Sequence, residues 1–148
     1  MNENNRTDNV FRLIRYLNKL IVADFDKRLS ECGLTDQQGR ILFFVYCKTR
    51  ECKIEIHQND IESEFHLSKS TVSGLVKRME KKGFIKIEKQ HPYAIIEPTE
   101  KGEDTIAYLR NNRRNAINHL LKDVDEQDKE KLMDLLEKLI SNMEGGNG

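Results

Sequence analysis

The most informative stretch of the chain is residues 68–88, which read SKSTVSGLVKRMEKKGFIKIE. Four apolar residues in it fall within an arc of about 100° on a helical wheel. They are Val72, Leu75, Val76 and Met79. Ser68 is a favoured N-cap residue and Gly83 a favoured helix stop, so we expect an amphipathic helix over residues 68–82. Residues 84–88 alternate between apolar and polar side chains, which predicts a strand directly after this helix.

The exposed face of the predicted helix changes character along its length. Its N-terminal half carries only small residues, namely Ser70, Thr71, Ser73 and Gly74. Small side chains let a helix backbone approach the floor of a DNA major groove, which is about 12 Å wide. The C-terminal half carries long cationic side chains that reach flanking phosphates, namely Lys77, Arg78, Lys81 and Lys82. The alternative is an ordinary surface helix with a solvated, charged face.

Helical periodicity also dominates the regions around this stretch. Apolar residues at steps of three and four predict a long helix over residues 10–29, ended by Gly33, and Thr35 caps a second helix. A short strand is expected over residues 53–56. Towards the C-terminus, Thr99 caps a helix that runs to about Leu121. A last helix begins near Asp125 and has an apolar stripe of Leu132, Leu135, Leu136, Leu139, Ile140 and Met143.

The arrangement next to the central helix predicts the fold. A brief helix over residues 58–65, with Ile61 and Phe65 buried, is separated from the central helix by a three-residue turn. Strands over residues 84–88 and 93–97 then form a hairpin. Two helices joined by a tight turn and followed by a hairpin make a winged helix-turn-helix. We therefore expect a mainly α chain with a small β-hairpin wing, flanked by long helices.

The net charge of the chain is zero, but the charges are unevenly distributed. Residues 68–93 contain seven lysines and arginines and two acids, a balance of +5. Residues 123–144 contain three lysines and eight acids, a balance of −5. A nucleic acid responds to the local field of its partner, so the basic centre is compatible with DNA binding despite the neutral total.

Several functional classes find no support in the sequence. The longest apolar runs fall short of the roughly 18–20 residues that cross a bilayer, and the polar first eight residues lack a signal-peptide core, so we expect a cytoplasmic protein with no membrane partner. The three cysteines are expected to be reduced thiols. The four histidines show no metal-ligand spacing, and no catalytic constellation or phosphate loop is present. We expect no metal, no cofactor and no enzymatic activity.

Three stretches resemble the multiple antibiotic resistance regulator (MarR) family of winged helix-turn-helix transcription regulators. They are GLTDQQGRIL at residues 33–42, SKSTVSGLVKRMEKKGFI at residues 68–85 and TEKG at residues 99–102. Their order and spacing match the family over nearly the whole chain. The resemblance implies a homodimer that binds a pseudo-palindromic operator in double-stranded DNA, as a repressor released by a small aromatic or lipophilic effector.

The resemblance also implies a division of the chain. Residues 8–32 and 99–144 would form a helical dimerisation region, and residues 35–98 the winged DNA-binding domain. The apolar stripe of the last helix would then be a subunit interface, although part of it belongs to the intrachain core. Effectors of the family bind between these two regions. Four aromatic residues are candidates to line such a cleft or to be ordinary core, namely Tyr16, Phe43, Phe44 and Tyr46.

The wing departs from the family pattern. An Asp-x-Arg pair is usual in the family, and its arginine enters the minor groove, but the corresponding positions here are Gln90 and Pro92. The loop is also about three residues short. Lys86, Lys89, Gln90 and His91 are the available substitutes. A wing of this kind would contact phosphates and position the protein without reading bases.

The predicted DNA-binding residues come from the central helix and the wing. They are Ser68, Lys69, Ser70, Thr71, Ser73, Gly74, Lys77, Arg78, Lys81, Lys86, Lys89, Gln90 and His91. The competing hypothesis is a protein-interaction module that has the winged fold but does not bind DNA. The acidic second and last helices and the short wing favour this alternative.

Overall fold

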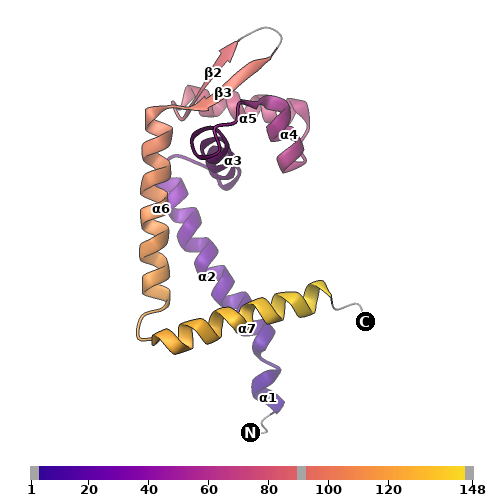
Figure 1. Ribbon diagram of the computed structural model, residues 1–148, viewed down its shortest axis with the longest axis vertical. Coiled ribbons are helices and arrows are strands. Elements are labelled where there is room, and N and C mark those ends of the chain that lie inside the picture. Colours follow the sequence, from indigo (N-terminus) through magenta and orange to yellow (C-terminus); the bar gives the residue numbers. More distant parts are fainter. Residues whose placement is uncertain (1–3, 90–92, 146–148) are drawn as a thin grey trace. The chain divides into compact units, whose positions relative to one another are not determined.

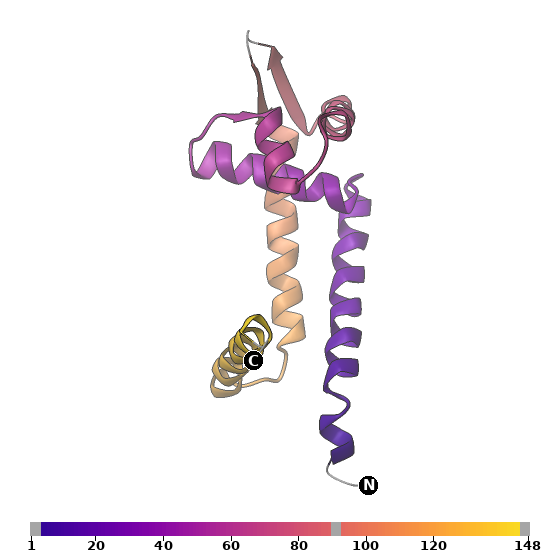
Figure 2. The same cartoon turned by 90° about the vertical axis from the view of Figure 1, so that its right-hand side faces the viewer.

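The computed structural model describes residues 4–89 and 93–145, and it confirms a mainly helical chain with a winged helix-turn-helix. Its elements are α1 (Asn4–Thr7), α2 (Val10–Glu31), α3 (Asp36–Tyr46), the π-helical segment η1 (Cys47–Glu51), β1 (Ile56–His57), α4 (Gln58–Phe65), α5 (Lys69–Lys81), β2 (Ile85–Lys89), β3 (Ala94–Pro98), α6 (Glu100–Leu120) and α7 (Glu126–Glu144). The chain divides into two compact units, one ending at Arg110 and one beginning at Asn111. In the first unit, α3, α4 and α5 gather beside the hairpin, and α2 extends away from them (Figures 1 and 2).

Four helices, α3, α5, α6 and α7, begin after a residue whose side chain accepts from a free amide of the first turn. Thr35 and Gln38 form a reciprocal capping box, in which each backbone N–H donates to the other side chain at 3.2 Å. The Ser68 hydroxyl accepts from the Thr71 amide, and the Thr99 hydroxyl accepts from the Gly102 amide at 3.1 Å. The Asp125 carboxylate accepts from the Asp128 amide at 2.8 Å. These contacts confirm the helix starts that the sequence predicts.

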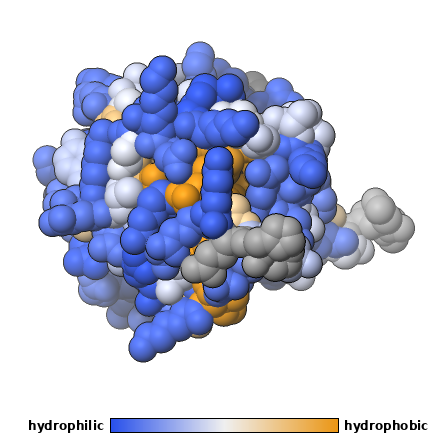
Figure 3. All heavy atoms as spheres, turned by 90° about the horizontal axis from the view of Figure 1, so that it is seen from above, coloured by the Kyte–Doolittle hydropathy of each residue, from blue (hydrophilic) through white to orange (hydrophobic). Residues whose placement is uncertain are grey.

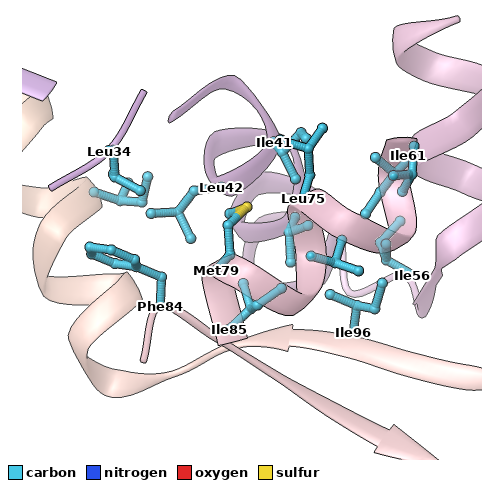
Figure 4. Close-up of a cluster of buried hydrophobic side chains, with 14 of the residues drawn as sticks. Leu34, Ile41, Leu42, Ile56, Ile61, Leu75, Met79, Phe84, Ile85 and Ile96 are labelled. Carbon is cyan, nitrogen blue, oxygen red and sulfur yellow. The ribbon is translucent and has the colours of Figure 1, made fainter. Parts of the chain in front are cut away.

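The core lies between α3, α5 and the sheet. Figure 4 shows Ile41 and Leu42 of α3 facing Leu75 and Met79 of α5. The buried side chains around them are Phe84, Ile85, Ile96, Ile56 and Ile61. All four residues of the predicted apolar stripe of α5 are buried. One face of α5 is therefore fixed by packing, and its opposite face is left for solvent or a ligand.

The sheet has three antiparallel strands in the order β1-β3-β2. β2 and β3 pair in the register Ile85 to Pro98 through Lys89 to Ala94, so each strand begins one residue later than predicted. The strand expected over residues 53–56 is wrong in its bounds, because only Ile56–His57 pairs with β3. Lys53 has a φ of 55°, and this left-handed conformation prevents an extended strand from beginning there.

Two apolar side chains of α4 were predicted to be buried, and the prediction is confirmed for Ile61 but wrong for Phe65. Ile61 is buried as expected, but Phe65 is only half-buried, and its ring meets the Phe44 ring edge-on at a centroid distance of 5.7 Å. Along α2 and α7, large apolar side chains are left exposed in this single chain. The exposed set on α7 is Leu132, Met133, Leu135, Leu136, Leu139, Ile140 and Met143.

Candidate nucleic-acid interface

The helix α5 is held between α4 and β2 and presents its polar face outward. The Ser68 hydroxyl caps the helix and also lies 2.8 Å from the Thr71 hydroxyl and 3.3 Å from that of Ser70. Ser70 and Thr71 are exposed, whereas Ser73 and Gly74 are half-buried rather than fully exposed as the wheel suggested. The start of α5 therefore offers a compact group of hydroxyls and free backbone amides, which suits a phosphate or base edges.

Four of the predicted cationic residues lie on the exposed face of α5. They are Lys69, Lys77, Arg78 and Lys81, all of α5 and all exposed. Within residues 4–89 and 93–145, no carboxylate pairs with any of these four side chains. Their charge is therefore available to an external anion. Figure 3, a view from the hairpin end, shows a face that is mostly hydrophilic around a small apolar area.

Arg78 lies across Gly74, one turn earlier on the same helix. A Cβ built on Gly74 would stand 3.3 Å from one terminal nitrogen of Arg78 and 3.8 Å from the other. The guanidinium thus points back towards the N-terminal half of α5, whereas the sequence predicted Arg78 only in the phosphate-facing half. The absence of a side chain at Gly74 leaves the room for this conformation.

Lys82 was expected to reach the DNA backbone, but in this structure its ammonium is hydrogen-bonded within the protein. Its ammonium donates to the Gly33 carbonyl at 2.8 Å and to Oε1 of Gln38 at 3.2 Å. The carbonyl of Lys82 itself accepts from Nζ of Lys101 at 2.7 Å. Lys82 is therefore engaged within the protein, unlike its neighbour Lys81.

The wing residues differ in their surroundings. Lys86 pairs with Glu97 on β3, with 3.3 Å between Nζ and Oε2, so part of its charge is neutralised within the sheet. Lys89 ends β2 and is exposed. Gln90 and His91 lie outside the described residues. Near the tip of the hairpin, the His57 ring bridges the Ala94 carbonyl at 3.1 Å and the Glu55 carboxylate at 3.0 Å.

The aromatic residues considered for an effector cleft separate into two kinds. Phe43, Phe44 and Tyr46 are half-buried against the hydrophobic core, and Tyr16 is 61% exposed on α2. A shallow recess of about 410 Å³ lies elsewhere, lined by Cys32, Glu100, Lys101, Asp104, Thr105 and Tyr108. Burial raises the pKa of the Cys32 thiol, and the charge of Glu31 adds to the effect, so this thiol is a weaker nucleophile than a free one.

The residues that the structure describes lack two further kinds of site, metal-binding clusters and membrane-spanning helices. Across residues 4–89 and 93–145, no three His, Cys, Asp or Glu side chains are arranged to hold a metal ion. Among the same residues, no helix combines the length and the apolar character that crossing a membrane requires.

Residues 33–91, which run from the end of α2 to the wing, match the MarR family. This winged domain belongs to the MarR family. No curated protein matches the sequence. The MarR family and the solved structures that resemble this chain are transcriptional regulators rather than enzymes, in agreement with the prediction from the sequence.

Solved structures extend the likeness beyond the winged domain. The transcriptional regulator Tm0710 from Thermotoga maritima is 26% identical, with a TM-score of 0.67 over 95% of this chain and 98% of its own. A putative MarR family transcriptional regulator from Clostridium acetobutylicum is 25% identical, with a TM-score of 0.76 over 90% and 97%. The Staphylococcus aureus MepR–DNA complex shares the fold, at 21% identity and a TM-score of 0.77 over 89% and 98%.

The network around Lys82 was not found by sequence reasoning. Gln38 and Lys101 stand out in the sequence only as parts of family-like stretches. The available signals were the capping-box spacing of Thr35 and Gln38 and the position of Lys82 directly before a helix-ending glycine. Neither signal shows that the two places meet in space.

Proposed function

We propose that the chain is a dimeric, sequence-specific DNA-binding transcriptional regulator whose helix α5 enters the major groove. The observation that carries this proposal is the group of cations on the exposed face of α5 that no described carboxylate pairs, namely Lys69, Lys77, Arg78 and Lys81. They stand next to the exposed hydroxyls of Ser70 and Thr71 and opposite a fully buried stripe. The MepR–DNA complex, which has the same fold, supports DNA binding.

The proposed site combines two kinds of contact. Ser68, Ser70, Thr71, Ser73 and Gly74 form the close-approach surface for base edges and the nearest phosphates. The contact is extended along the DNA backbone by the four cations of α5 and by four residues of the wing, namely Lys86, Lys89, Gln90 and His91. Because Lys86 already pairs with Glu97, we assign it a smaller part than Lys89.

The proposed regulator is a homodimer that recognises a pseudo-palindromic operator. Residues 35–98 form its DNA-binding domain, and residues 8–32 and 99–144 provide the dimerisation region. Two copies of α5 would enter successive major grooves, so the half-sites should lie about 10 bp apart. We further propose that the protein represses transcription and that a small aromatic or lipophilic molecule releases it.

The test measures fluorescence anisotropy with duplexes from the region upstream of the protein's own gene, over a series of salt concentrations. Wild type should bind with a steep salt dependence, because each phosphate contact contributes about 0.9 to the slope of log K against log salt. The K77A/R78A variant should bind more weakly and with a smaller slope. An unchanged slope in this variant would remove both residues from the backbone contact.

The alternative function has a distinct outcome in the same experiment. A protein-interaction module would show no binding to any duplex at low salt, although circular dichroism shows it to be folded. That result would contradict the proposed function as a whole. A non-operator duplex is the matched control, because weak binding to it separates electrostatic attraction from sequence recognition.

A further inference from the structure

Three segments that are distant in sequence meet at the C-terminal end of α5. From the turn after α2 comes the Gly33 carbonyl, and from the first turn of α3 comes the Gln38 side chain, both of which accept from Lys82 Nζ. From the start of α6 come Lys101, which donates to the Lys82 carbonyl at 2.7 Å, and Thr99, whose hydroxyl donates to the Gly83 carbonyl. The end of α5 is therefore tied on two sides by side chains.

Gln38 helps to fix the position of the Lys82 ammonium in this junction. It is 3% exposed and is the only buried polar side chain among the described residues. Its Oε1 atom accepts from the Thr35 amide and from Lys82 Nζ, each at 3.2 Å. A buried amide oxygen costs free energy unless it is hydrogen-bonded, so this atom favours one position of the lysine over others.

Lys82 and Lys81 provide a natural comparison. Both are lysines at the same end of α5, and both are exposed along part of their length. The Lys82 ammonium has two protein acceptors, whereas the Lys81 ammonium has none within the described part of the chain. Two of the three N–H donors of the Lys82 ammonium are used within the protein and hold it at the α2–α3 turn, whereas all three donors of Lys81 are available to a phosphate.

We infer that Lys82, acting through Gln38 and the Gly33 carbonyl, is a positioning residue that sets the orientation of α5 for DNA binding and does not itself contact phosphate. The inference rests on the proposed function. It assigns the positive charge at the end of α5 to two separate tasks, with Lys81 directed to the DNA and Lys82 directed to the α2–α3 turn. The junction also connects α5 to both long helices that flank the winged domain.

The experiment compares K82M, K82R and K81M by anisotropy over a salt series, with the duplex that wild type binds. K82M should weaken binding about tenfold, since losing hydrogen bonds to a charged group changes an equilibrium constant by that order, while the salt slope stays that of wild type. K81M should reduce the slope by about 0.9 for each phosphate that it no longer neutralises. K82R retains a donor for both acceptors and should restore most of the affinity.

A second comparison separates positioning from a simple loss of fold. Q38M removes the acceptor at nearly the same side-chain volume, and the Q38M/K82M double variant should bind no more weakly than the worse single variant, because the two residues act as one unit. All variants are measured at a temperature where circular dichroism shows them folded. Additive losses from Q38M and K82M would overturn the inference.

The remaining outcomes are distinct. A salt slope in K82M that falls as it does in K81M would show that Lys82 contacts phosphate, and unchanged affinity in K82M would show that the junction does not position α5. Either result overturns the inference and leaves the proposed function standing. A folded wild-type chain that binds no duplex contradicts the proposed function itself.

Discussion

At the scale of single residues, the surroundings of each basic side chain distinguish its role better than its charge does. Lys86 is paired with Glu97, Lys82 is bonded to Gly33 and Gln38, and Lys81 is free within the described residues. Exposed ion pairs contribute little to stability, so Lys86 could exchange Glu97 for phosphate at small cost. A cation with two backbone or buried acceptors could not do so as easily.

Gly74 gives a residue-scale prediction, because it leaves room for Arg78. The G74A variant should unfold at a higher temperature, since alanine is favoured over glycine within a helix by about 1 kcal/mol. It should nevertheless bind DNA more weakly, because its Cβ would stand 3.3 Å from an Arg78 nitrogen and move the guanidinium. Thermal unfolding and anisotropy measure the two effects.

The control for this prediction is the same change in an R78A background. Without the guanidinium, G74A should have no further effect on DNA affinity. An equal loss of affinity in both backgrounds would mean that Gly74 acts through its own close approach to the groove.

At the scale of the elements, the first turn of α6 packs closely against Phe84, which joins α5 to β2. A Cβ at Gly102 would stand 2.2 Å from the Phe84 carbonyl oxygen, and this is a backbone atom that no rotamer change can move. The neighbouring Thr99 amide donates to the same carbonyl at 3.1 Å. The first turn of α6 is thus packed against the start of the hairpin at backbone distance.

The G102A variant should lose about 2–4 kcal/mol of unfolding free energy, in spite of its better helix propensity. Urea denaturation measures this loss. The matched control is A107G at an exposed position of the same helix, which should lose only about 1 kcal/mol. A G102A variant as stable as wild type would show that α6 can shift away from Phe84.

At the scale of the whole molecule, α2 and α7 leave many large apolar side chains exposed in the single chain. Leu135, Leu136 and Leu139 are 48%, 42% and 44% exposed on α7. On α2, Phe11 is 68% exposed and Leu13 is 58% exposed. Contiguous apolar faces of this kind mark interaction surfaces, and a second copy of the chain is the partner that the proposed function requires.

The L136D variant tests this requirement. Multi-angle light scattering should give about twice the chain mass of 17.3 kDa for wild type and a mass close to 17.3 kDa for L136D. K138D places the same carboxylate on the opposite face of α7 and should remain a dimer. A wild-type chain that is monomeric at micromolar concentration would contradict the proposed assembly.

The sequence predicted the helices well because their signals are local. The stripe of Val72, Leu75, Val76 and Met79 and the cap at Ser68 are both contained in α5, and both are confirmed. The strand near residue 56 was misplaced because its pairing depends on β3, about 40 residues away. The same reason hid the junction at Lys82, whose partners Gly33 and Gln38 are 49 and 44 residues distant.

The way in which α5 is held has a consequence for changing what the protein recognises. Within the described residues, the side-chain hydrogen bonds that link α5 to the α2–α3 turn, to α3 and to the start of α6 all involve Lys82 and Gly83, directly after its last residue. The core needs only the buried stripe. The exposed side chains of Ser70 and Thr71 take part in none of these bonds, and their hydroxyl contacts are with the capping residue Ser68. Variants with new operator preferences can therefore be selected by randomising positions 70 and 71, because these changes leave the hydrogen bonds at the C-terminal end of α5 intact.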